Sequence, residues 1–255
     1  MKQDPAYTVF AADFAAKNRD TMNQEMEFLD TIFKRNDVKK ALVVACGAGR
    51  LTFPLDALGY KMNGVDLSSQ LIRIAKAEAR KQGRMIRFSV GDMRKLKTQG
   101  KFDAVICMWG SFTYIESIND MLKTLDGMNR NLKRGGLVII DVAPGWHEIV
   151  ISKIYKLKMY GKPVKNGRID KADIEFDPAD QFSLQHDEYI TYVNGKIRSR
   201  THFDRKRYHF TPTMFDLLLR LAGFKVMTFY SDRDIRKRLP QKKLKRLIAV
   251  AKKIR

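Results

Sequence analysis

The stretch Ala41–Leu51, which reads ALVVACGAGRL, decides the fold of this 255-residue chain. Its first six residues are all apolar, as expected of a parallel strand that is covered on both faces. The Gly47–Gly49 turn follows, and Leu51–Leu58 then reads as a helix whose first turn accommodates Pro54. Glycines let a backbone approach a ligand closely, and the start of a helix offers unpaired N–H groups. We therefore expect a ligand-binding turn between this strand and this helix.

The alternation of strand and helix continues as far as residue 142. Ser68 or Ser69 has the composition of an N-cap for a helix that runs to Gln82. This order of elements predicts a doubly wound, Rossmann-like α/β sheet with helices on both faces. We expect further strands at 61–66, 86–90, 102–108 and 137–142, a helix at 118–132, a tight turn at 133–136, and an amphipathic helix at 19–34 before the first strand.

The pattern changes after residue 145. Residues 182–192 and 196–208 read as strands that are joined by a turn at Asn194–Gly195, a strong hairpin signal. We expect the segment 146–208 to form an antiparallel insert that serves as a substrate lid. Outside this hairpin, helices are expected at 149–160 and 212–222, and strands at 224–230 and 245–251. No linker or internal repeat interrupts the sequence, so residues 1–255 are expected to form a single domain.

The net charge of +21, from 49 Lys and Arg against 28 Asp and Glu, sets the chain apart. Such an excess favours an anionic partner, either a nucleic acid or a phosphorylated or carboxylated substrate. A solvated, lysine-rich surface would give the same number, and nucleic acid remains a possible partner on charge alone. No apolar run approaches the ~18 residues of a membrane span, and the first residues lack a signal peptide, so we expect a cytoplasmic protein with no membrane partner.

Cysteine and histidine give no sign of a metal site. Cys46 and Cys107 lie in or beside apolar strand-like runs and are expected to be buried, reduced thiols. The four histidines show neither the spacing nor the cysteine partners of a metal site, so no metal is expected.

Asp66, at the end of the second expected strand, is a candidate ligand-binding carboxylate. It follows the glycine turn at about the 20-residue spacing at which a carboxylate binds ribose hydroxyls in nucleotide-binding sheets. Thr52 occupies the third glycine position of a dinucleotide motif, so a pyrophosphate cradle is not expected. A glycine turn followed by a carboxylate at this spacing, without a pyrophosphate cradle, suits a ligand that carries a nucleoside.

At this point the chain resembles the class I S-adenosylmethionine-dependent methyltransferases. The resemblance rests on Ala41–Asp66, Phe88–Met93, Phe102–Tyr114 and Leu132–Asp141, together with Arg207-Tyr208 and Leu221–Phe224. It is closest to members that carry an antiparallel insert after the fifth strand. It implies that the cofactor is S-adenosylmethionine, that the product is S-adenosylhomocysteine, and that the last two strands form an antiparallel pair.

The resemblance also assigns roles to residues. It places the methionine part of the cofactor over the glycine turn, the ribose on Asp66, the adenine beside Leu67 and the Asp92-Met93 pair, and the reacting side beside the end of the fourth strand. The expected cofactor-binding residues are Cys46, Gly47, Ala48, Gly49, Asp66, Leu67, Asp92, Met93, Met108 and Trp109. The sequence departs from the family at Val43, where members usually carry an acidic residue that helps to hold the cofactor's ammonium group, and at Ala45, where they carry a glycine.

The candidate substrate-binding residues are aromatic, basic or titratable. Tyr7 and Tyr114 are expected as aromatic walls, and Tyr208 belongs to the segment shared with the family. His147 could act as a general base or be a solvated loop residue, and Arg200 could clamp an anion or belong to the outer face of the hairpin. No catalytic residue is expected by type, because methyl transfer is an in-line displacement that requires alignment and exclusion of water.

Three functions compete on sequence alone. The favoured one is methylation of a small or anionic molecule, because no separate RNA-binding module is present. Methylation of RNA is an alternative that the net charge favours, but Met108–Ser111 differs from the Asn-Pro-Pro-Tyr-type tetrapeptide of base methylases. A catalytically weak, nucleic-acid-binding relative is a third, which Val43 favours and Asp66 and Asp92 oppose.

Overall fold

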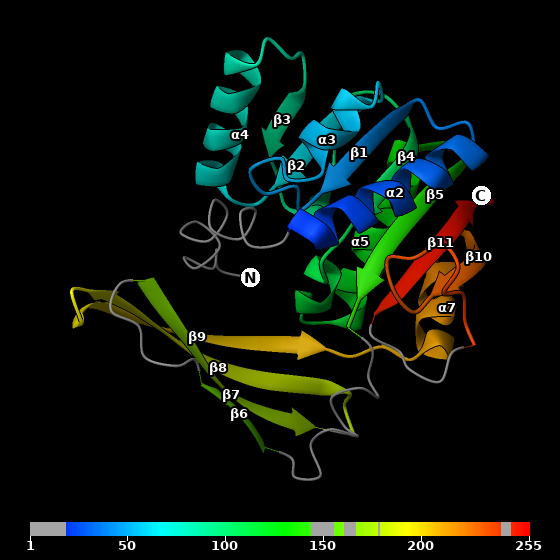
Figure 1. Ribbon diagram of the computed structural model, residues 1–255. Coiled ribbons are helices and arrows are strands. Elements are labelled where there is room, and N and C mark those ends of the chain that lie inside the picture. The colour runs from blue at the N-terminus through cyan, green and yellow to red at the C-terminus, as the bar shows by residue number, and fades with distance from the viewer. Residues whose placement is uncertain (1–18, 144–155, 161–166, 178, 241–245) are drawn as a thin grey trace.

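The computed structural model describes residues 19–143, 156–160, 167–177, 179–240 and 246–255. Within them, seven strands form one mixed sheet in the order β10-β11-β5-β4-β1-β2-β3, and four form an antiparallel sheet in the order β6-β7-β8-β9 (Figure 1). In the larger sheet β11 runs antiparallel to both β5 and β10, whereas the other neighbours are parallel. The Rossmann-like sheet with an antiparallel last pair is therefore confirmed.

Apart from β5, the elements of the larger sheet lie within about two residues of the expected bounds. Its strands are β1 (Lys40–Val44), β2 (Lys61–Asp66), β3 (Arg87–Val90), β4 (Phe102–Cys107), β5 (Leu132–Val142), β10 (Phe224–Tyr230) and β11 (Leu247–Lys253). The helices around it are α2 (Arg19–Arg35), α3 (Thr52–Ala57), α4 (Ser69–Lys81), α5 (Ile118–Asn131) and α7 (Pro212–Leu221), with short 3-10 turns η1 (Met93–Lys95) and η2 (Ser111–Tyr114). Among these described helices, none is both long and apolar enough to cross a membrane.

The apolar run of β1 is explained by burial on both of its faces. Leu42 and Val44 join a core with α5 and α7, while Ala41 and Val43 join a second core with α2, α3 and α4. Successive side chains of a strand point to opposite faces, so a strand between two helical layers must be apolar throughout. Both cysteines are free and buried, as predicted.

Two local predictions are wrong. Residues 133–136 do not separate a helix from a strand: β5 begins at Leu132 and runs through them, although Gly135 has φ +74° and the register with β4 is irregular there. The C-terminal part of the helix expected at 149–160 is the strand β6 (Lys156–Tyr160), which pairs with β7 (Gly167–Asp177), a strand that was not expected. Residues 149–155 lie outside the described residues.

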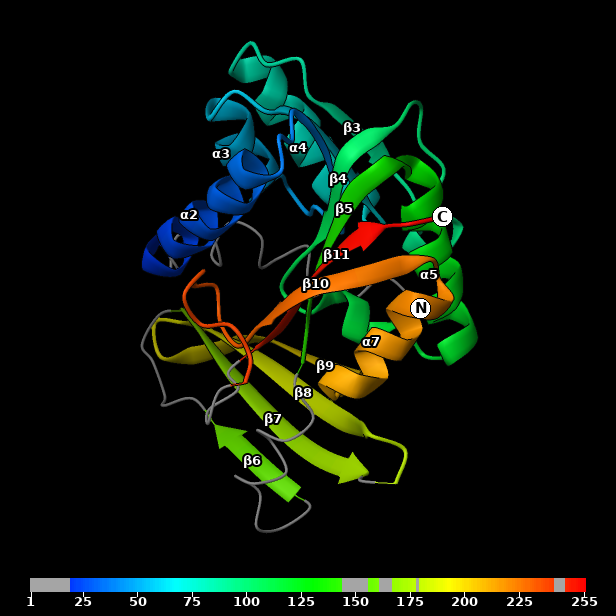
Figure 2. The same ribbon diagram turned by 90° about the vertical axis from the view of Figure 1, so that its right-hand side faces the viewer.

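The smaller sheet is completed by the hairpin of β8 (Phe182–Val193) and β9 (Lys196–Tyr208). Its turn has φ +52° at Asn194 and +75° at Gly195, the two left-handed residues that a tight hairpin requires. Figures 1 and 2 show this sheet beyond the end of the larger sheet to which β5 points. The hydroxyl of Tyr208 donates to the carbonyl of Glu116 (3.1 Å), which ties β9 to the turn after β4.

Candidate active site

The glycine turn and the end of β2 are joined through Asp66. Its carboxylate accepts hydrogen bonds from the backbone N–H of Gly47 (2.7 Å) and of Ser68 (2.8 Å). Burial raises the pKa of this carboxyl, while the N–H groups of Ser68 and Gly47 oppose the shift. A carboxylate has about four acceptor positions, so Asp66 retains capacity for hydroxyl donors after both bonds are made.

The backbone of the turn is left-handed at alternate residues. Ala45, Gly47 and Gly49 have φ of +56°, +56° and +93°. A Cβ atom at Gly49 would lie 2.5 Å from the ring of Phe53, so only glycine fits there. A Cβ at Gly47 would meet a single atom, the Leu71 Cδ1 at 3.9 Å, so space remains beside the turn at this residue.

Asp92 lies at the end of the neighbouring strand β3 and caps η1. Its carboxylate accepts from the backbone N–H of Arg94 (2.9 Å) and from Nε and Nη2 of the same side chain (3.0 and 2.6 Å). The Arg94 hydrogen bonds lower the pKa of Asp92. This carboxylate, expected beside the adenine, is thus already held by Arg94, while Leu67 and Met93 are half-buried.

Trp109, directly after buried Met108 at the end of β4, is strained. Its φ is +65°, which is unusual for a bulky residue and is found where the surroundings enforce it. The enforcing contacts are two carboxylates: Asp141 of β5 accepts from the backbone N–H (3.2 Å) and Glu25 of α2 accepts from the indole Nε1 (2.7 Å). Both carboxylates are fully buried.

Two arginines lie over the ring of this tryptophan, and a third pairs with Asp141. The guanidinium carbons of Arg50 and Arg233 each lie 4.5 Å from the indole centroid. Arg50 also donates to Glu25 (2.6 Å), and Arg246 donates through Nε to Asp141 (2.9 Å). We call this group the arginine cluster; its members are Glu25, Arg50, Trp109, Asp141, Arg233 and Arg246.

The arginine cluster carries more positive than negative charge. Three guanidinium groups face two carboxylates, which leaves one positive charge unbalanced among the described residues. Arg233 is 6% exposed, and its Nε lies 3.6 Å from a Glu25 oxygen, too far for a hydrogen bond. Burial lowers the pKa of Arg233, although both carboxylates oppose this shift. The side chains of Arg50 and Arg246 are 20% and 23% exposed, so the excess charge reaches the surface through them.

The residues expected on the substrate side are not all brought together. Tyr114 lies at the end of η2, with the guanidinium of Arg205 5.9 Å from its ring centroid. Arg200 is exposed, in the half of β9 nearest the hairpin turn, and donates to Glu188 (2.7 Å). Tyr7 and His147 lie outside the described residues.

Most of the arginine cluster was missed from the sequence. Its charged members come from positions 25 to 246 and share no local spacing. One signal was available: Asp141 interrupts the apolar run of β5, and a carboxylate in a buried strand requires charged or hydrogen-bonding partners.

Comparisons with known proteins find similarity to methyltransferases. Residues 41–136 match the profile of a family described as a methyltransferase domain. The chain is 25% identical over 194 residues to the "Putative methyltransferase YqeM" of Bacillus subtilis (strain 168), covering 76% of each chain. It is 28% identical over 219 residues to a glycine/sarcosine N-methyltransferase of Aphanothece halophytica, covering 82% of this chain and 75% of that one.

A solved structure has the same fold. It is an S-adenosylmethionine-dependent methyltransferase from Clostridium acetobutylicum ATCC 824, with a TM-score of 0.83 over 97% of this chain and 99% of that one, at 19% identity.

Proposed function

We propose that this chain is a class I S-adenosylmethionine-dependent methyltransferase whose methyl acceptor is a small molecule that carries an anionic group. The observation that carries the proposal is the unbalanced positive charge of the arginine cluster. An anion placed against Arg50 and Arg246 would balance it. The side chains of Arg50 and Arg246 are only 20% and 23% exposed, so solvent screens their charge incompletely, which favours a ligand of opposite charge at this position.

The residues of the glycine turn fit the cofactor. Gly47 leaves space beside the backbone, and the carboxylate of Asp66 borders it with free acceptor capacity for the two hydroxyls of a ribose. We propose that Asp66 binds these hydroxyls and that Leu67, Asp92 and Met93 border the adenine. Val43 is buried in the core, so β1 offers no carboxylate to the cofactor's ammonium group.

The protein's part in the reaction is to align the acceptor with the methyl group and to enclose both away from water. When bound, S-adenosylmethionine would supply a methyl group on a sulfonium sulfur, and an acceptor atom would bond to the methyl carbon as the methyl–sulfur bond breaks. Holding the acceptor by its anionic group would fix its orientation toward that methyl group. The indole of Trp109, at the carboxyl end of β4, packs against the guanidinium groups of Arg50 and Arg233 and holds them in place. We also propose that the insert at 146–208 acts as a lid over the acceptor.

One relative supports an acceptor of this class. Glycine and sarcosine, which name the Aphanothece halophytica enzyme, are small amines that bear a carboxylate. RNA as the acceptor keeps only the net charge of +21 in its favour.

The test uses acetate as a minimal carboxylate and acetamide as its uncharged counterpart. The full chain, saturated with S-adenosylhomocysteine, is titrated with each by calorimetry. Acetate is expected to bind and acetamide not. The variant Arg246→Gln should weaken acetate binding by about tenfold, the scale of one charged hydrogen bond, Arg246→Lys should lose less, and Arg73→Gln, on the exposed face of α4, should lose nothing.

Two results would reject the proposal. Equal affinities for acetate and acetamide would show that charge is not recognised. A variant Arg246→Gln that binds S-adenosylhomocysteine more weakly, but acetate as before, would show that the cluster serves the carboxylate of the cofactor instead.

A further inference from the structure

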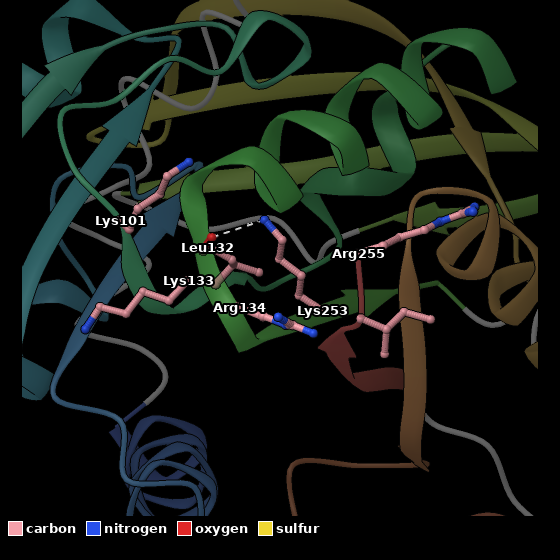
Figure 3. Close-up of a pocket in the computed structure, with 7 residues that line it drawn as sticks. Lys101, Leu132, Lys133, Arg134, Lys253 and Arg255 are labelled. Carbon is pink, nitrogen blue, oxygen red and sulfur yellow. Dashed lines mark hydrogen bonds between the residues drawn. The ribbon is translucent and has the colours of Figure 1, made fainter.

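A second basic feature lies at the end of the larger sheet opposite the glycine turn, where β4 and β5 begin. It is a hollow of about 650 Å³ at the amino ends of β4 and β5 and the end of β11 (Figure 3). Because β4 and β5 are parallel, their carboxyl ends, where Trp109 and Asp141 lie, face away from it. The hollow is therefore separate from the active site. We call it the basic hollow.

Cations dominate its lining. Five of its seven lining residues are basic, and no Asp or Glu side chain is among them; the five are Lys101, Lys133, Arg134, Lys253 and Arg255. The other two, Leu132 and Ile254, are apolar. Three separate segments of the chain supply these residues, so the concentration of charge is a product of the fold and not of one basic run.

Most of this charge is not neutralised by carboxylates. Lys133 pairs with Asp103 (2.6 Å). Lys101 donates to the carbonyl of Arg130, and Lys253 donates to the carbonyls of Asn129 (2.8 Å) and Leu132 (3.2 Å). Carbonyl groups orient an ammonium but carry no net charge. Within the described part of the chain, no carboxylate pairs with Lys101, Arg134 or Lys253.

The energetic consequence is visible at Lys253. Burial lowers the pKa of its ammonium, and the nearby cation of Lys101 lowers it further. A bound anion would stabilise the charged form of every cation in the hollow and so raise its pKa. Arg134 adds a planar guanidinium fork, which matches two oxygens of a phosphate group.

We propose that the basic hollow binds a multiply charged phosphate, of the kind found in pyrophosphate or in the phosphate chain of a nucleotide. Several cations around one concave site suit a compact polyanion. A single carboxylate would leave most of the charge unbalanced. This site is independent of the acceptor proposed for the active site.

The experiment titrates the full chain with sodium pyrophosphate by calorimetry at low ionic strength. The double variant Lys101→Gln/Arg134→Gln should bind about tenfold more weakly or worse. Arg134→Gln alone, which removes no hydrogen bond seen among the described residues, should show part of this loss even if the double variant is less stable. The matched control is Arg73→Gln/Lys76→Gln on the exposed face of α4, which removes the same net charge and should change the affinity less than about twofold.

Three outcomes would overturn the proposal. Pyrophosphate could fail to bind the wild-type chain, or all variants could lose affinity equally, as diffuse attraction predicts. A single-stranded RNA of roughly 12 nucleotides, within the range of common binding sites, could bind far more tightly than pyrophosphate and depend on the same residues, which would identify a nucleic-acid surface instead.

Discussion

The carboxylate of Asp66 accepts a hydrogen bond of 2.7 Å from the backbone N–H of Gly47. The bond joins the end of β2 to the turn after β1, across two strands that pair in parallel. The residue proposed to hold the ribose therefore also fixes the loop that faces the rest of the cofactor. Changes at Asp66 should act on both.

The variant Asp66→Asn should weaken binding of S-adenosylhomocysteine by about 1–3 kcal/mol, because hydrogen bonds to a charged acceptor are replaced by weaker ones and one N–H loses its partner. Calorimetric titration measures this. Asp56→Asn, on α3 and paired with Arg84, is the matched control and should leave the affinity unchanged. An Asp66→Asn protein with wild-type affinity would exclude the carboxylate from cofactor binding.

Cofactor affinity should depend on pH through the same residue. Burial places the pKa of Asp66 above its ordinary value in the free protein, and ribose hydroxyls that donate to the ionised carboxylate would lower it in the complex. Between the pKa of the free protein and the lower pKa of the complex, binding therefore releases a proton. The affinity for S-adenosylhomocysteine should be highest above the pKa that Asp66 has in the free protein, and it should fall as the pH drops through that pKa. The difference between wild type and Asp66→Asn, titrated at several pH values with S-adenosylhomocysteine, isolates this effect. A difference that is constant with pH would contradict it.

The larger sheet and the β8–β9 hairpin of the smaller sheet were predictable because their signals are local. The apolar run at 41–46, the Ser68 cap, whose hydroxyl accepts from the N–H of Leu71 (3.2 Å), and the Asn194–Gly195 turn each encode their structure within a few residues. The strand β6 was not predictable in this way. It has only five residues, and its hydrogen bonds come from β7, a partner that the sequence did not reveal.

The candidate site also has a part that local sequence signals predict and a part that they do not. The pairing of the glycine turn with Asp66 follows from the order of parallel strands and was expected. The arginine cluster joins α2, the turn after β1, Arg233 just after β10 and Arg246 just before β11. It therefore depends on packing between segments that are far apart in the sequence. Arg233 and Arg246 read in sequence only as part of a basic stretch before the last strand.

Glu25→Gln should destabilise the fold. Glu25 is fully buried, accepts from Arg50 and Trp109, and faces Arg233, so the neutral side chain would leave the three guanidinium groups of the cluster facing the single carboxylate of Asp141. Breaking a buried ion pair on one side costs about 3 kcal/mol or more. Urea unfolding measures the change. Glu27→Gln, exposed on the same helix, should cost less than about 0.5 kcal/mol. Similar values for the two variants would mean that the arginine cluster does not contribute to stability.

Gly49→Ala should be far more costly than Gly83→Ala, although both residues have positive φ. At Gly83, with φ +63°, an added Cβ meets nothing within 4 Å, so only the left-handed backbone is penalised, by about 1–2 kcal/mol. At Gly49, with φ +93°, the Cβ would lie 2.5 Å from the Phe53 ring and 3.2 Å from that of Phe88, and overpacking adds about 1–3 kcal/mol. The free energies of unfolding of the two variants give the comparison. A smaller loss for Gly49→Ala than for Gly83→Ala would show that the two rings move aside at little cost, and the tight packing of the turn against α3 and β3 would then not be what fixes its shape.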